Sequence, residues 1–347
     1  MMCRSACLSR MGRLSCWPVG GVSKRHSDRV QYSHMMSLTH TCTQTAYSFQ
    51  YHLLTYPRER HFPSNQPAPN PVANVFLIDQ EHTKAGLDIT QDGLNMLLDH
   101  IDAFPQLGYA LPAFAASDVP VHEGKTNFNS LQRWETSGDF TFELSMLLKY
   151  VELNGNKSDP VPYSIRQQLF YQNFCWEKKM ESAVLFRAST VLKRRIQEEF
   201  HGQGGYASHW TNLPVLLIGS IPSGWAEYVK FLDEGVWRIE KSSSFTNPFL
   251  ESLGEANFKT LQATQKYHDL LSRATHVLQN NIRTLNSLFK ESKKRKKAEK
   301  GGFEEHYELL DTTIEDVNDE LEGFVKHAGL ILARLTRITE AVRFPRP

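Results

Sequence analysis

Cysteine is scarce in most of this sequence. The chain has 347 residues and five cysteines, and four of these, Cys3, Cys7, Cys16 and Cys42, lie near its start. Cys175 stands alone in the remainder, so no internal disulfide framework can form there, and we expect a reducing compartment such as the cytoplasm. The spacing of Cys3, Cys7 and Cys16 matches no standard zinc motif.

Long apolar runs are missing as well. A membrane-spanning helix needs about 18–20 consecutive apolar residues. The nearest candidate, Leu213 to Ile218, is far too short. The sequence as given therefore predicts no membrane span, and we expect a soluble protein.

The sequence also lacks a dominant charge and any familiar catalytic signature. Its net charge is +1, so no global field favours nucleic acid or a membrane surface. The glycine-rich residues 201–205 lack the Lys-Ser/Thr of a phosphate loop, and residues 219–224 do not fit Gly-x-Ser-x-Gly. We interpret His209, beside Trp210, as a packing residue. Local spacing predicts no enzyme, although a hydrolase assembled only by the fold stays an alternative.

The charge that is present is unevenly distributed. The first 60 residues hold eight Lys or Arg residues against two acids, so the remaining chain is acidic. A basic, Ser-rich start is typical of mitochondrial targeting segments, but Pro18, Gly20 and Gly21 interrupt any amphipathic helix. We expect residues 1–65 to form a disordered or targeting-like basic head, which keeps a mitochondrial location as an alternative. Four prolines in residues 62–72 indicate an extended linker.

Residues 66–250 carry the patterns of an α+β domain. Apolar, β-favouring runs predict strands at residues 72–79, 139–153, 163–174 and 182–189, and we expect the last three to form an antiparallel meander with one buried face. A helical pattern starts at the N-cap candidate Thr90. Further helices are expected at residues 191–200 and at residues 213–242, with a break near Pro222 and Gly224. The predicted fold is an α/β/α-type domain with a mainly antiparallel mixed sheet.

Residues 251–347 predict long, coiled-coil-like stalk helices. Apolar residues recur at helical spacing in residues 258–292. In the second run they alternate in steps of four and three. These residues are Phe303, Tyr307, Leu310, Ile314, Val317, Leu321, Phe324, Ala328, Ile331, Leu335, Ile338 and Val342. A period of 3.5 keeps one narrow apolar seam against partners over about 60 Å of helix.

A basic stretch at residues 291–300 separates the two helical runs, and residues 304–322 hold nine acids and no Lys or Arg. If the helices fold back as a hairpin, these opposite charges face each other. A nucleic-acid patch is the alternative for the basic stretch, and we favour the hairpin. The acidic residues could also hold Mg²⁺, although a charged outer face is the commoner explanation. The candidate cluster is the eight acids before Glu322, namely Glu304, Glu305, Glu308, Asp311, Glu315, Asp316, Asp319 and Glu320.

One stretch, residues 140–174, resembles the CorA-like transporter domain found in many fungal proteins. The pattern is a strand ending near Tyr150, an Asn-rich turn, Asp-Pro, and an aromatic-Ser-Ile-Arg-Gln block. The matching positions are Asp159, Tyr163, Ser164, Ile165, Arg166, Gln167 and Tyr171. The family usually has Trp at the position of Tyr163, and this chain adds Val161-Pro162. Residues 258–288 look like the family's first long helix, so the resemblance covers about residues 70–343.

The resemblance implies an α/β cytosolic domain followed by a stalk. In CorA-type Mg²⁺ channels the stalk continues into two membrane helices joined by a Gly-Met-Asn loop, and five chains surround a pore. This sequence contains no Gly-Met-Asn, so we do not expect it to conduct ions alone. The implied role is a non-catalytic assembly or regulatory module, resembling the soluble part of a divalent metal transporter.

Several further expectations follow from the resemblance. Partners would be further copies of this chain or related CorA-like subunits, bound through the stalk, and the chain would be membrane-associated only through a full-length transporter. No cofactor is assigned with certainty, Mg²⁺ is possible, and no metal ligands can be mapped. The motif residues are expected to be structural, with Ile165 in the core and Arg166 paired with an acid from a helix or a neighbouring subunit. The alternative function is a coiled-coil interaction protein unrelated to transport.

Overall fold

The computed structural model describes residues 52–56, 73–81, 85–115, 126–134, 139–156, 158–178, 180–201, 209–244, 253–299 and 303–343. Most of the predicted basic head and the proline-rich linker lie outside these ranges. The expectation of a disordered or targeting-like head is corrected at His52–Tyr56, because these residues form strand β1. The strand predicted at residues 72–79 is therefore not the first strand of the sheet.

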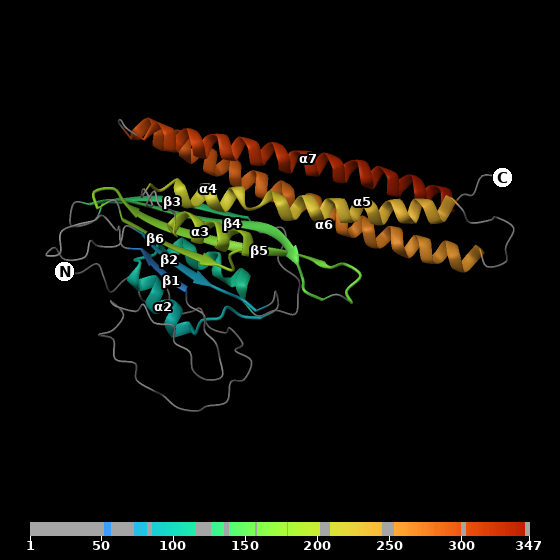
Figure 1. Cartoon of the computed structure of the whole chain (residues 1–347), viewed down its shortest axis with the longest axis horizontal. Coiled ribbons are helices and arrows are strands. Elements are labelled where there is room, and N and C mark those ends of the chain that lie inside the picture. Colours follow the sequence, from blue (N-terminus) through green and yellow to red (C-terminus); the bar gives the residue numbers. More distant parts are fainter. Residues whose placement is uncertain are drawn as a thin grey trace, which may run out of the picture.

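Six strands form one sheet in the order β1-β2-β6-β5-β4-β3 (Figure 1). Their bounds are β2 Ala73–Ile78, β3 Asn127–Trp134, β4 Phe140–Leu153, β5 Tyr163–Cys175 and β6 Met180–Phe186. Only β2 and β6 pair in parallel, and every other neighbouring pair is antiparallel. The predicted mixed, mainly antiparallel sheet is confirmed, and β3 is an addition that the sequence analysis did not identify.

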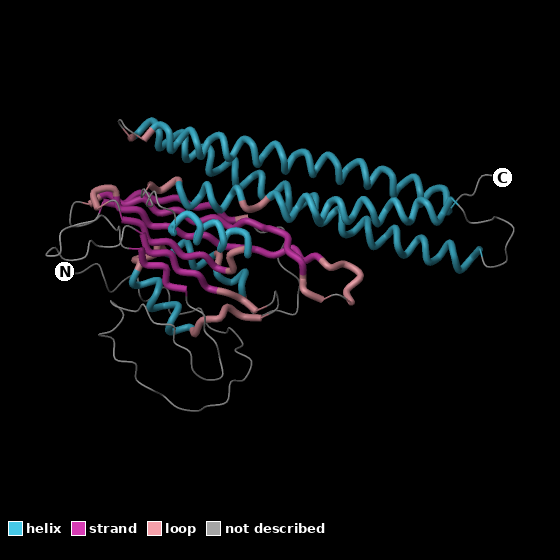
Figure 2. Tube along the Cα trace, in the orientation of Figure 1, coloured by secondary structure: helices cyan, strands magenta, loops and turns pink. Residues whose placement is uncertain are grey.

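Helices cover both faces of the sheet, which gives three layers (Figure 2). The thin layer contains α2 (Gln91–His100) and the 3₁₀ helices η2 (Pro105–Tyr109) and η3 (Leu111–Phe114). The thick layer contains α3 (Thr190–His201), α4 (Asn212–Gly219), α5 (Pro222–Ser244), α6 (Leu253–Ala298) and α7 (Glu304–Arg343).

Two helix starts follow from local chemistry. The Thr90 hydroxyl oxygen accepts a hydrogen bond from the Gly93 N–H at 3.1 Å, so Thr90 caps α2 as predicted. Pro222 is the first residue of α5, where a proline costs nothing because the N–H it lacks would have no helical partner. The predicted break between two helices near Pro222 is therefore confirmed.

Strand β4 is buried on both faces. Phe142, Leu144, Met146 and Leu148 face the thick helical layer, while Leu147 belongs to the core beneath α2. The prediction of a meander with one buried face is wrong for this strand, because helices lie against both sides of it. Its polar residues Thr141, Glu143 and Ser145 are consequently buried as well.

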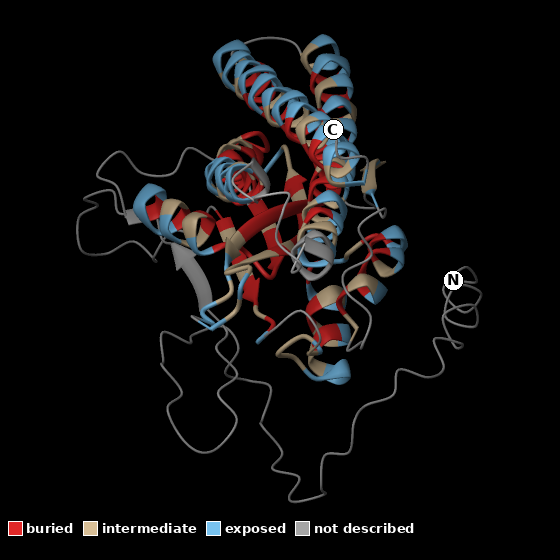
Figure 3. Ribbon diagram, turned by 90° about the vertical axis from the view of Figure 1, so that its right-hand side faces the viewer, coloured by how far each residue is buried: buried red, intermediate tan, exposed pale blue. Residues whose placement is uncertain are grey.

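The long helices α6 and α7 lie side by side as a hairpin against α5 and α4. Figure 3 shows the buried residues gathered between the helices and the sheet. The predicted seam of α7 is buried along most of its length, including Leu321, Ile331 and Leu335. These residues belong to the same core cluster as residues of α4, α5 and α6. The expectation that the seam faces a neighbouring subunit is therefore corrected, since helices of the same chain cover it.

Asn281 of α6 closes an open edge of β4. Strand β3 pairs with β4 only as far as Leu147. Beyond that point the Lys149 N–H donates to the Asn281 side-chain oxygen at 2.9 Å, and the Asn281 amide donates to the Lys149 carbonyl at 2.6 Å. The Trp225 indole N–H also donates to this carbonyl, at 3.2 Å. The carboxamide thus continues the ladder where the strand partner ends.

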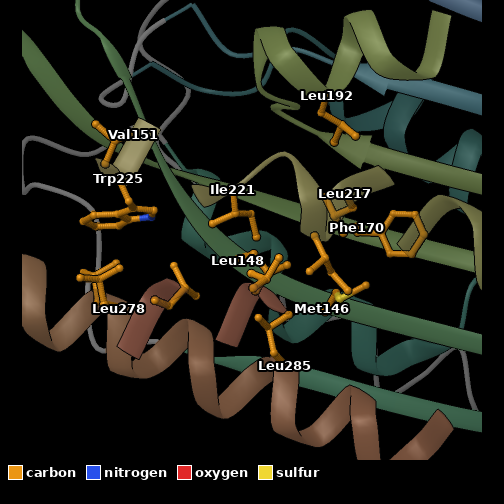
Figure 4. Packing of buried hydrophobic residues seen from close by; sticks show 14 of the residues in the cluster. Met146, Leu148, Val151, Phe170, Leu192, Leu217, Ile221, Trp225, Leu278 and Leu285 are labelled. Atoms are coloured by element: carbon orange, nitrogen blue, oxygen red, sulfur yellow. The ribbon is translucent and has the colours of Figure 1, made fainter. Parts of the chain in front are cut away.

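Apolar contacts surround this junction. In Figure 4, Leu278 and Leu285 of α6 point toward the face of the sheet that carries Leu148, and Trp225 of α5 belongs to the same core cluster. The start of α5 also approaches β4 closely, because a Cβ at Gly224 would lie only 2.1 Å from the Val151 carbonyl oxygen. Glycine is the residue that permits this approach.

Replacing Asn281 by leucine keeps the approximate volume and removes both hydrogen bonds to Lys149. We expect a loss of about 1–3 kcal/mol in the free energy of unfolding, because the buried Lys149 N–H loses its partner. Urea denaturation of the full chain measures this loss. The control Asn286→Leu alters an exposed asparagine of the same helix and should change stability by less than about 0.5 kcal/mol. Equal losses in both variants would contradict the proposed edge closure.

Candidate functional site

The first motif residue, Asp159, organises the turn between β4 and β5. Its carboxylate accepts hydrogen bonds from the Val161 N–H at 2.8 Å and from the Asn154 side chain at 3.0 Å. Asn154 also donates to the Val161 carbonyl at 3.0 Å. These bonds hold together the turn that the Asn-Gly and Asp-Pro pairs predicted.

Tyr163 and Ile165 connect β5 to helix α5. The Tyr163 ring lies 5.8 Å from Tyr228 and 5.4 Å from Phe231, measured between ring centroids. Its hydroxyl donates to Glu227 at 3.4 Å. Ile165 is buried in the same core cluster as Trp225, as expected. Ser164 is half-buried opposite Glu152 of β4.

Arg166 pairs with an acid of the neighbouring strand. Its guanidinium lies 2.9 Å from Glu152, and the other oxygen of Glu152 accepts the Thr190 N–H at the start of α3, at 2.7 Å. The expected partner from a helix or another subunit is thus replaced by a residue of β4. The pair is partly exposed, and its position ties β5, β4 and α3 together.

Gln167 and Tyr171 face the thin layer. The Gln167 amide donates to the Ala113 carbonyl in η3. The Tyr171 ring lies 5.5 Å from Phe104 between centroids, and its hydroxyl donates to Glu143 at 2.6 Å. The motif residues therefore do not converge on one point. They hold both helical layers and one turn to the central strands.

Glu143, which the sequence analysis did not single out, forms a buried polar centre. Its carboxylate accepts hydrogen bonds from Tyr171 and from the Phe104 N–H, the latter at 2.8 Å, and it pairs with Arg133 of β3. Arg133 also contacts Asp102 at 3.1 Å. The alternation of β4 placed Glu143 on the strand face expected to meet solvent, and only recognition of β3 and η2 could have indicated its burial.

Burial raises the pKa of the Glu143 carboxyl above its ordinary value, while the Tyr171 hydrogen bond and the Arg133 charge act in the opposite direction. Burial and the neighbouring Glu143 charge likewise raise the pKa of Tyr171, which keeps its hydroxyl protonated as a donor. This arrangement favours a fixed structural link, since a buried carboxylate with these partners has little access to a substrate.

The opposite charges of the two long helices meet as predicted. Lys293 lies 2.8 Å from Asp311, and the Ser292 hydroxyl donates to the same carboxylate at 2.7 Å. Lys296 lies 3.4 Å from Glu308. Acids thus already engage part of the basic stretch, which weakens the nucleic-acid alternative. Within the described ranges, no group of three or more His, Cys, Asp or Glu side chains is placed to hold a metal.

His209 packs among rings at the turn of the hairpin. It stacks on His306 at 4.6 Å and on Phe303 at 5.1 Å between centroids, and its Nδ1 lies 2.8 Å from the Thr211 hydroxyl. Its Nε2 lies 3.8 Å from Glu299. A His beside an acid is the feature that a hidden hydrolase would need, but this ring is buried between its neighbours.

No family model and no curated protein matches the chain. Among solved structures, the full-length CmaX protein matches with a TM-score of 0.50 at 9% identity, covering 78% of this chain and 67% of that one. The CorA magnesium transporter of Methanocaldococcus jannaschii gives 0.48 at 10% identity, with coverages of 81% and 72%. The ZntB cytoplasmic domain of Vibrio parahaemolyticus gives 0.41 at 10% identity, with coverages of 76% and 86%.

The likeness to CmaX concerns the fold alone, given the low identity. Among the helices that the structure describes, none combines the length and apolar character that a bilayer span requires.

The Tyr171→Phe variant removes one hydrogen bond to the buried Glu143 carboxylate. Because hydrogen bonds to charged groups contribute more than neutral ones, we expect a loss of about 1.5–3 kcal/mol in unfolding free energy near neutral pH. Urea denaturation measures it. Tyr163→Phe is the matched control on the same strand. It should lower the unfolding free energy by less than about 0.5 kcal/mol, because the hydrogen bond from the Tyr163 hydroxyl to Glu227 is exposed. An unchanged unfolding free energy in Tyr171→Phe would contradict the stabilising role of this hydrogen bond.

The Glu143→Gln variant tests the raised pKa. A carboxyl with a higher pKa in the folded chain binds its proton more readily there, so its contribution to stability falls as pH rises from about 4.5 through the folded pKa. The stability of the natural chain minus that of Glu143→Gln should therefore increase as the pH is lowered from about 7. Urea midpoints across this range measure the trend. Glu322→Gln, at an exposed site, is the control, and a constant or decreasing difference for Glu143 would refute the assignment.

Proposed function

We propose that this chain is a non-catalytic, CorA-like module of the cytoplasm that assembles with or regulates a divalent metal transporter. The observation that carries the proposal is the sequence pattern of residues 140–174. Its residues lie where β4 and β5 meet α3, α5 and η3. The fold likeness to CmaX supports an architecture of one sheet domain with long helices.

The shape of the helical layer suits assembly. The C-terminal parts of α5 and α7 and the N-terminal part of α6 extend past the sheet along the long axis of the molecule (Figure 1). Because the apolar seam of α7 is covered within the chain, we infer that a second copy or a related subunit binds the outer surface of this projecting end. Leu330 of α7, which is 69% exposed, lies on that outer surface.

Mg²⁺ sensing is the second part of the proposal. Asp311 and Glu308 already pair with lysines of α6. Because no three acidic side chains converge within the described residues, a hard cation would need carboxylates from two chains, at a site that forms on assembly.

Light scattering of the full chain, with and without Mg²⁺, tests the proposal. We expect an oligomer whose population increases with Mg²⁺. Leu330→Glu should shift it toward the monomer, because a charge would be buried at the contact. Leu309→Glu is the control, since Leu309 is 54% exposed on the same helix but close to the hairpin turn.

The alternative is a coiled-coil interaction protein unrelated to transport, favoured by the length of the helical hairpin. An oligomer that is lost in Leu330→Glu but does not respond to Mg²⁺ would favour it. A monomer under both conditions would overturn the assembly proposal.

A further inference from the structure

A hollow of about 350 Å³ lies between one end of the sheet and the last turns of α6. Its walls include Trp134, Phe140 and Trp176 from the sheet side, and Arg295 and Glu299 from the helical hairpin. This volume falls within the range typical of small-ligand sites. None of the motif residues of β5 takes part in it.

Three aromatic rings line the sheet side of the hollow. The ring centroids of Trp134 and Phe140 are 5.0 Å apart with planes at 49°, and those of Phe140 and Trp176 are 6.5 Å apart and stacked. Trp134 is 75% exposed, so its indole face is accessible to a ligand. The face of an aromatic ring carries negative π density, which attracts a cation placed over it.

The charge of the lining is negative. Glu177 and Glu299 are both part of it. Arg295 does not offset them, because its guanidinium is buried over the Phe142 ring at 4.1 Å and pairs with Glu291 at 2.6 Å. The two lining carboxylates therefore exclude an anionic ligand and attract a cation.

One oxygen of each of these two carboxylates accepts a hydrogen bond from the protein. Glu177 Oε2 accepts the Phe140 N–H at 2.8 Å, and Glu299 Oε2 accepts the Tyr307 hydroxyl at 2.5 Å. The buried Trp176 indole N–H has no hydrogen-bond partner in the part of the chain that the structure describes. This nitrogen has almost no accessible surface, so only the ring of Trp176 is available to a ligand.

We propose that this hollow binds an alkylammonium group. The aromatic rings contact the cation, and Glu177 and Glu299 balance its charge. A small quaternary amine and a lysine side chain of a peptide share this chemistry. Because the walls come from the sheet and from α6, the bound ligand would hold the hairpin turn against the sheet.

Ligand-observed NMR titration of the full chain tests the proposal with defined probes. Choline should bind. Its neutral isostere 3,3-dimethyl-1-butanol should bind with an affinity at least about tenfold lower, because only the cation is attracted by the rings and the carboxylates. Nα-acetyl-lysine methylamide is the peptide arm. Tighter binding of this probe than of choline would assign the site to a protein lysine, and the reverse would assign it to a small amine.

Two tryptophan variants localise the binding. Trp134→Ala should weaken choline binding about tenfold, and Trp134→Phe should retain part of the affinity. Trp237→Ala is the matched control, because Trp237 is 53% exposed on α5 and lies beneath Lys241 instead. Circular dichroism checks that each variant is folded. Equal binding of choline and its neutral isostere, equal losses in Trp134→Ala and Trp237→Ala, or no binding of either ammonium probe would overturn the proposal.

Discussion

The burial of β4 on both faces is the constraint on which the rest of the structure depends. Water does not reach a strand that helices cover on both sides, so its backbone and polar side chains need hydrogen-bond partners within the protein. Glu143 therefore requires Tyr171, Arg133 and the Phe104 N–H, and the buried ladder edge at Lys149, which β3 does not reach, requires Asn281 and Trp225. These partners come from β3, β5, α5, α6 and the residue that precedes η2, so one strand fixes the placement of elements on both sides of it.

The long helices complete this arrangement. The α7 seam is continuous, yet α4, α5 and α6 of the same chain already cover it. A regular heptad pattern thus indicates a long helix with one buried stripe, and it does not tell whether the covering helices belong to the same chain. The outer surface of the projecting end, including the exposed Leu330, is where we propose that a partner binds.

Much of the fold could be predicted from local patterns. The cap at Thr90, the break before Pro222 and the charge complementarity at Lys293 and Asp311 depend on residues close to the expected elements. What could not be predicted depends on long-range pairing. The sequence of β3 lacks clear alternation, so neither the strand nor its Arg133–Glu143 pair was identified. Arg166 was expected to reach a helix, because the register that places Glu152 nearby was unknown. The aromatic hollow likewise assembles from four separate segments.

The two proposed sites lie at opposite ends of the α6–α7 hairpin. The hollow adjoins its turn, and the surface for a partner lies on the projecting end (Figure 1). Both helices run without interruption, over 46 and 40 residues, and are packed along a continuous seam. A packed rod of this kind has no internal hinge, so coupling between its ends would require the whole hairpin to shift on the sheet. The Asn281–Lys149 junction lies between the two ends and would have to break or move in such a shift, as would the contact of Arg295 with Phe142.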